Sequence, residues 1–148
     1  MISVERAIRI PVAADVAWQV LGDFSLSRLS AGICKYVTVE GEGVGMVRTM
    51  HLVDDWGGGY VRERLEELSL VDRYMRYRLV DSGPVPFADY IGSIRVSPAG
   101  PGACVAVMTS CFVPVEISDE TARRMSEGNI EKALSNARAA AVALASAR

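Results

Sequence analysis

The sequence predicts one α+β domain, in which a curved antiparallel sheet of about seven strands wraps around a long C-terminal helix. Three observations indicate this. Short β-like runs recur along residues 2–113, with turn residues between them. The segment from residue 118 onward has no β pattern and is rich in helix-forming residues. The chain has 148 residues, 50% of them hydrophobic, which suits one packed core, so we treat residues 1–148 as a single domain.

The first predicted element is a strand over residues 2–10, ISVERAIRI, because apolar and polar residues alternate along it. Proline has no N–H to donate to a strand partner, so we expect Pro11 to end this strand. The face expected to be buried carries Ile2, Val4, Ile8 and Ile10.

Two short helices are predicted after the first strand. Residues 13–24 form the first, and Gly22 is expected near its end. The second covers residues 25–32, SLSRLSAG, which could also form a turn. The core-facing positions of the first helix recur at helical spacing and are Val16, Val20 and Phe24.

The middle of the chain predicts an antiparallel meander. Its separators, such as GEGVG, DDWGGG and PAGPG, contain the Gly, Pro and Asp that tight turns require. The predicted strands are residues 33–40, 46–53, 60–68, 73–80, 90–97 and 103–113.

One of these strands has a competing interpretation. Val61, Leu65 and Leu68 are spaced as on a helix, whereas Val61, Glu63 and Leu65 would share one face of a strand. The surrounding meander favours the strand, which places Glu63 in the middle of an apolar face. Burying a carboxylate costs several kcal/mol unless a partner satisfies it, so Glu63 requires an explanation.

The last predicted element is a long helix that Ser118 or Asp119 can cap. Gly128 is unfavourable inside a helix and is expected to mark a kink or a close approach. The apolar stripe that would cover the sheet consists of Met125, Ile130, Ala133, Leu134, Ala137, Ala141 and Leu144.

Composition excludes several classes of function. The net charge is −2 and no basic run occurs, so nucleic acid is not an expected partner. The longest apolar run, AAAVALA, is too short for membrane insertion, and the N-terminus does not resemble a signal peptide, so we expect a cytoplasmic protein. Three cysteines without CxxC and the single His51 predict no disulfide framework, metal or cofactor. Nothing in the sequence indicates an oligomeric state.

Five segments, taken in order, carry a family resemblance: PVAADVAWQVLGDF, GEGVGMVRTMHL, YVRERLEEL, DRYMRYRLVDSGPVPFADYIGSI and FVPVEISDE. Together they resemble the Bet v 1-like proteins of the START/SRPBCC superfamily, specifically the polyketide cyclase/dehydrase branch. The resemblance covers nearly the whole chain. It implies a helix-grip fold with an internal ligand cavity between the sheet and the C-terminal helix.

The pattern is also similar to plant abscisic-acid receptors and lachrymatory-factor synthases. The receptor resemblance implies that Lys35, Glu63, Tyr90 and Asn129 contact a ligand, and the synthase resemblance implies catalytic roles for Arg48 and Glu63. The receptor gate loop is replaced by DDWGGGY and the latch region reads SGPVPF, so a phosphatase partner is not implied.

The alternation of side chains along the predicted strands agrees in part with the residues that the resemblance implies. Lys35, Arg48 and Tyr90 each fall on a mostly apolar strand face, and Gly92 shares the face of Tyr90. A few polar groups in an apolar cavity are typical of a small-molecule site. Alternatively, Glu63 forms a structural ion pair with Arg48 or Lys35, or Lys35 is an exposed edge charge. The predicted ligand-binding residues are Lys35, Arg48, Glu63, Tyr90, Gly92 and Asn129.

Three functions stay open from the sequence. The first is binding of a small hydrophobic or amphipathic molecule, such as a polyketide, lipid or isoprenoid. The second is a cyclase, dehydratase or isomerase in which Glu63 exchanges a proton and Arg48 stabilises an oxyanion. An adjacent Arg48 would, however, favour the ionised carboxylate and weaken Glu63 as an acid. The third is a protein-interaction role. The sequence does not identify the ligand.

Overall fold

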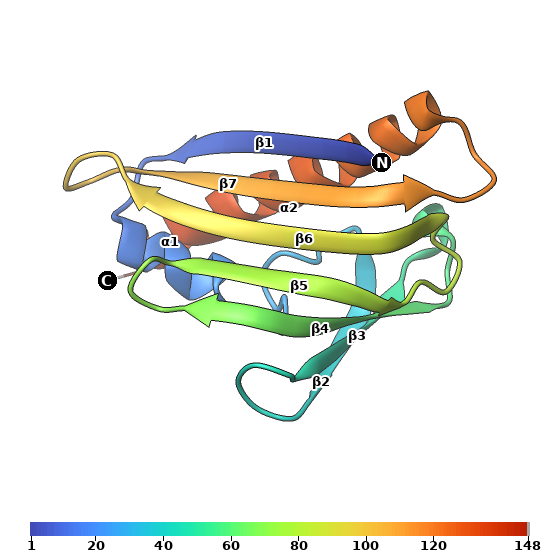
Figure 1. The fold of residues 1–148 in the computed structure, drawn as a ribbon. Helices are drawn as coiled ribbons and strands as arrows, with labels where there is room; N and C mark the ends of the chain where they lie inside the picture. The colour runs from blue at the N-terminus through green and yellow to red at the C-terminus, as the bar shows by residue number, and fades with distance from the viewer. Residues whose placement is uncertain (148) are drawn as a thin grey trace.

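The computed structural model describes residues 1–147 and has one seven-stranded antiparallel sheet in the order β1-β7-β6-β5-β4-β3-β2. The long helix α2 runs along one face of this sheet (Figure 1). The elements are β1 (Ile2–Ile10), α1 (Ala14–Leu21), β2 (Cys34–Glu40), β3 (Val47–Leu52), η1 (Asp54–Trp56), β4 (Tyr60–Ser69), β5 (Tyr74–Asp81), β6 (Phe87–Pro98), β7 (Cys104–Pro114) and α2 (Asp119–Ser146). The predicted α+β helix-grip architecture is confirmed.

The prediction of two short helices after the first strand is wrong for the second of them. Helix α1 ends at Leu21 and has the expected Gly22 as its C-cap, but the segment that follows forms turns. Asp23 accepts hydrogen bonds from the backbone N–H of Ser25 and from the hydroxyl groups of Ser25 and Ser27. Such local bonds compete with helix formation. Leu26 has a φ of 56°, a left-handed conformation that also interrupts a helix.

The segment with two interpretations is the strand β4. Glu63 points to the buried side together with Val61 and Leu65, and it is only 5% exposed. On the neighbouring strand β3, Arg48 pairs directly with Glu63 in the strand register. The sequence argument for an inward carboxylate therefore holds.

Strand β6 begins earlier than expected, at Phe87, and contains a bulge. The register shifts between Ala88 and Ile91, and Asp89 has a φ of 53°. The extra residue changes which side chains face inward, so that Phe87 and Tyr90 are both buried although they are three residues apart. The ring of Phe87 lies 4.0 Å from that of Phe112 and 6.1 Å from that of Tyr90, measured between centroids.

Helix α2 begins at the predicted cap, where the Ser118 hydroxyl accepts a hydrogen bond from the N–H of Thr121 at 3.1 Å. The helix continues through Gly128, and a Cβ at this position would meet no atom within 4 Å, so the expected close approach is absent at this residue. Met125 is 37% exposed and does not belong to the buried stripe. That stripe consists of Ala122, Ser126, Ile130, Ala133, Leu134, Ala137 and Ala141.

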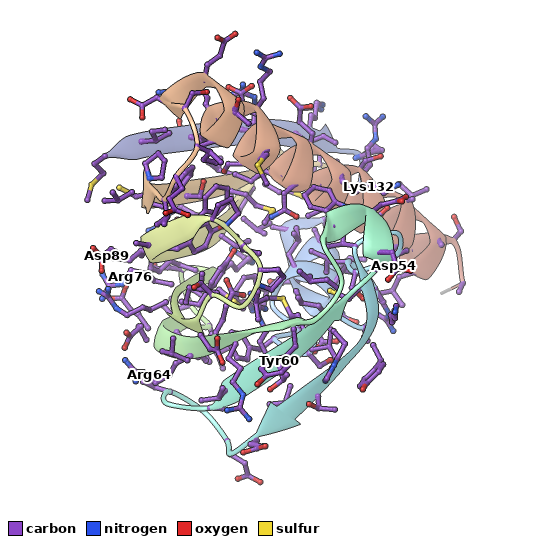
Figure 2. The ribbon with its side chains drawn as sticks, turned by 90° about the vertical axis from the view of Figure 1, so that its right-hand side faces the viewer. Asp54, Tyr60, Arg64, Arg76, Asp89 and Lys132 are labelled. Atoms are coloured by element: carbon purple, nitrogen blue, oxygen red, sulfur yellow. The ribbon has the colours of Figure 1, made fainter. Side chains whose placement is uncertain are left out.

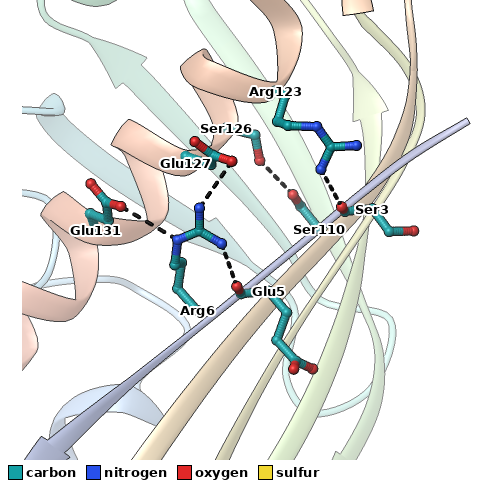
Figure 3. Close-up of polar contacts among 8 residues, drawn as sticks. All are labelled: Ser3, Glu5, Arg6, Ser110, Arg123, Ser126, Glu127 and Glu131. Carbon is teal, nitrogen blue, oxygen red and sulfur yellow. Dashed lines mark hydrogen bonds and ion pairs between the residues drawn. The ribbon is translucent and has the colours of Figure 1, made fainter. Parts of the chain in front are cut away.

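Helix α2 contacts the sheet mainly along one edge. It packs chiefly against β1, β7 and α1. Figure 3 shows Arg6 of β1 reaching Glu127 at 2.9 Å and Glu131 at 3.4 Å. The buried hydroxyl groups of Ser110 on β7 and Ser126 on α2 are hydrogen-bonded to each other. Strands β3, β4 and β5 instead contribute side chains to the wall of a cavity.

Candidate ligand-binding site

A cavity of about 590 Å³ lies between α2, strands β3 and β4 and the loops that follow β3 and β5. We call it the outer chamber. Its polar lining consists of Asp55, Glu63, Tyr90, Arg124 and Asn129. Apolar side chains form the larger part of its wall: Ile33, Met50, Leu52, Trp56, Val61, Leu79, Val85, Phe87, Ile117 and Met125.

A second cavity of about 80 Å³, the inner chamber, adjoins the first. Its wall includes Arg48, Tyr77 and other deeply buried side chains. Five residues line both chambers, and we call them the neck: Ile33, Met50, Glu63, Tyr90 and Asn129. All the polar side chains of the neck, those of Glu63, Tyr90 and Asn129, were predicted from the sequence.

Arg48 and Glu63 form a buried ion pair at the inner side of the neck. Atoms Nε and Nη2 of Arg48 donate to Oε1 of Glu63 at 2.9 and 2.7 Å, and Nη1 donates to the Phe24 carbonyl at 3.1 Å. The guanidinium carbon lies 4.2 Å from the ring centroid of Phe24 and 4.5 Å from that of Tyr77. Arg48 is only 2% exposed. These charge-assisted bonds and ring contacts satisfy a charge that would otherwise be costly to bury.

The turn after α1 positions the Phe24 carbonyl, a role that sequence analysis missed. Oδ1 of Asp23 accepts from the Ser25 N–H at 3.0 Å and its hydroxyl at 2.6 Å, and Oδ2 accepts from the Ser27 hydroxyl at 2.7 Å. Burial raises the pKa of Asp23, but these hydrogen bonds outweigh burial and hold it below its ordinary value. The D-x-S-x-S spacing is the available sequence signal, because Asp and Ser side chains stabilise such turns.

One oxygen of Glu63 stays free. In residues 1–147 both hydrogen bonds to this carboxylate end on Oε1, and none reaches Oε2. No polar side-chain atom in the same range is both fully buried and without a partner. Because Glu63 lines both chambers, Oε2 must therefore be accessible from the cavity. The neck presents a carboxylate oxygen as an unoccupied acceptor.

The other polar groups of the neck are uncharged. Burial, followed by the proximity of Tyr77 and of the Glu63 carboxylate, raises the pKa of Tyr90 well above its ordinary value. Burial and Glu63 likewise raise the pKa of Tyr77. Both phenols therefore stay protonated at neutral pH. The Asn129 side chain has no hydrogen-bond partner within residues 1–147 and can both donate and accept.

Two predicted site residues lie outside the cavity wall. Lys35 is 56% exposed, and its ammonium group lies 3.4 Å from Asp54 of η1. Figure 2 looks onto the end of the molecule that carries η1 and labels Asp54 there. A register shift between Cys34 and Tyr36 reverses the expected parity, so Cys34 faces inward in place of Lys35.

Gly92 is the second of these residues. It is buried under the ring of Tyr77, and a Cβ at Gly92 would lie 2.4 Å from Cε2 of that ring. The glycine therefore makes room for Tyr77, and Tyr77 lines the inner chamber. Gly92 is not among the residues that line either chamber, and within the structure it affects the inner chamber through the position of Tyr77.

The loop after β3 contributes Asp55, Trp56 and Gly57 to the outer chamber. Gly57, Gly58 and Gly59 have φ values of 101°, 63° and 63°, which favour glycine. A Cβ at Gly57 would lie 3.5 Å from Pro84, so this loop meets the β5–β6 loop beside the cavity. The Trp56 side chain is part of the chamber wall.

Within residues 1–147, no three His, Cys, Asp or Glu side chains lie together as a metal site would require. No helix in this range is long and apolar enough to cross a membrane.

A curved sheet that holds a helix across an apolar cavity defines a class of proteins with internal ligand sites. Residues 1–142 match the family model for polyketide cyclase / dehydrase and lipid transport, and the chain belongs to this family. Membership supports a ligand-binding or cyclase role. No curated protein matches the chain.

Several solved structures share the fold. Protein XoxI from Bacillus cereus has 24% identity and a TM-score of 0.83, with 96% of each chain covered. The Zhui aromatase/cyclase from Streptomyces sp. R1128 has 21% identity and a TM-score of 0.75, covering 96% of this chain and 92% of that one. Norcoclaurine synthase from Thalictrum flavum has 16% identity and a TM-score of 0.74, covering 95% and 94%.

Proposed function

We propose that the protein binds a small, mainly apolar molecule in the outer chamber, with the polar end of that molecule at the neck. The observation that carries this proposal is the chamber itself, about 590 Å³ of space walled mostly by apolar side chains. Small-molecule sites commonly have volumes of roughly 300–1,000 Å³ and a few polar groups that orient the ligand. Glu63, Tyr90 and Asn129 are the orienting groups.

A second candidate function is a cyclase or dehydratase acting on such a molecule. The specific observation in its favour is the free Oε2 of Glu63, which can accept a proton from a bound substrate. The names of two structural relatives point the same way, one an aromatase/cyclase and the other a synthase studied in complex with dopamine and hydroxybenzaldehyde.

Arg48 has a narrower role in this chemistry than an oxyanion-binding residue would have. Three of its N–H groups are directed at Glu63 and the Phe24 carbonyl. Arg48 lines the inner chamber but not the outer one. It holds the Glu63 carboxylate in place and balances its charge.

Native mass spectrometry of the protein purified from its own host tests the binding proposal. We expect a co-purified small molecule, together with saturable binding of the amphipathic dye ANS, whose aromatic rings require an apolar site. Displacement of that dye by the recovered molecule would place both in one site. A protein that carries no added mass and binds no dye would contradict the proposal.

The recovered molecule then distinguishes binder from enzyme. For a binder, Glu63→Gln should weaken affinity by about 1–3 kcal/mol, the scale of one charge-assisted hydrogen bond. For an enzyme, the same change should leave affinity nearly intact and reduce turnover by roughly two to four orders of magnitude. Glu67→Gln is the matched control, because Glu67 is an exposed carboxylate on the same strand. A molecule recovered unchanged after long incubation excludes turnover.

A further inference from the structure

We propose that the neck selects ligands whose polar end is an uncharged hydrogen-bond donor, such as a phenol or an alcohol, and that it rejects carboxylates. This inference rests on the proposed binding function and names the class of ligand for the same site. It follows from the arrangement of acceptors and charges around Glu63, Tyr90 and Asn129.

The first observation concerns the unoccupied hydrogen-bond acceptor of Glu63. Oε2 of Glu63 is accessible from the cavity and receives no hydrogen bond from residues 1–147. A ligand hydroxyl that donates to it would form a charge-assisted bond, which is stronger than a bond between neutral groups. The hydroxyl oxygen could at the same time accept from the Asn129 amide, which has no other partner in the described chain.

The positive charges near the site are already committed, so a carboxylate ligand finds no counter-ion. Within residues 1–147, the positively charged residues that line the two chambers are Arg48 and Arg124. Arg48 is held by Glu63, and Arg124 is 69% exposed and pairs with Glu120 at 2.7 Å. Lys35 lies outside the wall, beside Asp54. A ligand carboxylate at the neck would lose its hydration and face the Oε2 of Glu63.

An uncharged donor is also preferred over a cation. Arg48 already balances the charge of Glu63 at 2.7 Å, so the ion pair is neutral as a unit. Tyr90 and Asn129 add no negative charge. A ligand ammonium would therefore bring an unbalanced charge into an apolar chamber, which is costly. A hydroxyl group gains the hydrogen bond without this cost.

A series of naphthalenes of matched size tests the inference at pH 7 by displacement of the uncharged dye N-phenyl-1-naphthylamine. The four probes are 2-naphthol, which donates; 2-methoxynaphthalene, which only accepts; naphthalene; and 2-naphthoate, which is an anion. We expect 2-naphthol to bind about tenfold or more tightly than 2-methoxynaphthalene, the effect of one charge-assisted hydrogen bond. We expect 2-naphthoate to bind most weakly of the four.

The variants Glu63→Gln and Glu67→Gln assign the preference to the neck. Glu63→Gln should reduce the preference for 2-naphthol over its methyl ether to less than about threefold, whereas Glu67→Gln should retain it. The wild-type series decides the inference even if Glu63→Gln folds poorly. Equal affinity for 2-naphthol and 2-methoxynaphthalene, or tighter binding of 2-naphthoate, would overturn the selectivity alone. If none of the four probes binds, the proposed function fails as well.

Discussion

Gly92 on β6 lies directly across from Tyr77 on β5, and a side chain at Gly92 would occupy the space of the tyrosine ring. An added Cβ would come within 2.4 Å of the ring carbon Cε2. A glycine inside a strand often marks such a close approach. Since the same ring packs on the Arg48 guanidinium, this strand pairing helps to hold the ion pair of the neck.

Gly92→Ala should therefore lower the free energy of unfolding by about 1–3 kcal/mol, the usual effect of overpacking. In a protein that already carries Tyr77→Leu, Gly92→Ala should cost much less unfolding free energy, because the ring with which the alanine clashes is absent. Urea unfolding of the two single variants and the double variant measures the coupling. Strictly additive effects would show that Tyr77 and Gly92 do not contact each other.

Replacing one partner of the Arg48–Glu63 ion pair should destabilise the fold more than replacing both partners does. Arg48→Met leaves the Glu63 carboxylate buried without its partner, and we expect a loss of roughly 3–5 kcal/mol in unfolding free energy. The double variant Arg48→Met/Glu63→Met should lose clearly less than the sum of its single variants. Denaturant titration checks this, with Glu67→Gln expected to stay within about 0.5 kcal/mol of wild type. A double variant that is as unstable as the sum would contradict a direct coupling.

Gly128 offers a way to fill the outer chamber without disturbing the core. It lines the cavity, and a Cβ there meets nothing within 4 Å. Gly128→Ala should raise the unfolding free energy by roughly 0.5–1 kcal/mol, because alanine favours a helix. Gly128→Trp should abolish ANS binding and keep the fold.

The control for Gly128→Trp is Ala139→Trp, which places the same bulk on an exposed position of α2. This variant should bind ANS as wild type does. Undiminished dye binding by a folded Gly128→Trp protein would place the dye outside the outer chamber. Dye fluorescence and circular dichroism, recorded on the same samples, separate loss of binding from loss of structure.

Cys34 should make stability fall at alkaline pH. Burial raises the pKa of its thiol to about 11, with Glu63 adding to the effect and Arg48 opposing it. An unfolded chain releases this proton at lower pH than the folded chain does, so its contribution to stability is fully present below about pH 9 and is lost as the pH rises through about 11. The difference in unfolding free energy between wild type and Cys34→Ala should shrink over this range. A constant difference would mean that the thiol titrates normally.

Much of the fold could be predicted because the strands alternate regularly and the C-terminal segment does not. Glu63 could be identified for the same reason, since a charge inside an apolar alternation is conspicuous. Lys35 was misplaced because the bulge beside Cys34 reverses the parity and leaves no mark in the sequence. The role of Gly92 depends on the conformation of Tyr77, a partner on another strand, and local patterns carry no such information.

Because α2 contacts mainly one side of the sheet, the strands should differ in how well their amide hydrogens are protected from exchange with solvent. Strands β1 and β7 are covered by the helix, whereas β2 and β3 depend mainly on pairing within the sheet, and β2 is an edge strand. Amide hydrogens of β2 and β3 should therefore exchange with deuterium sooner than those of β1, β7 and the buried face of α2. A ligand that spans from Asn129 to Glu63 would connect the two regions. Its binding should slow exchange in β3 and β4 and leave β1 nearly unaffected.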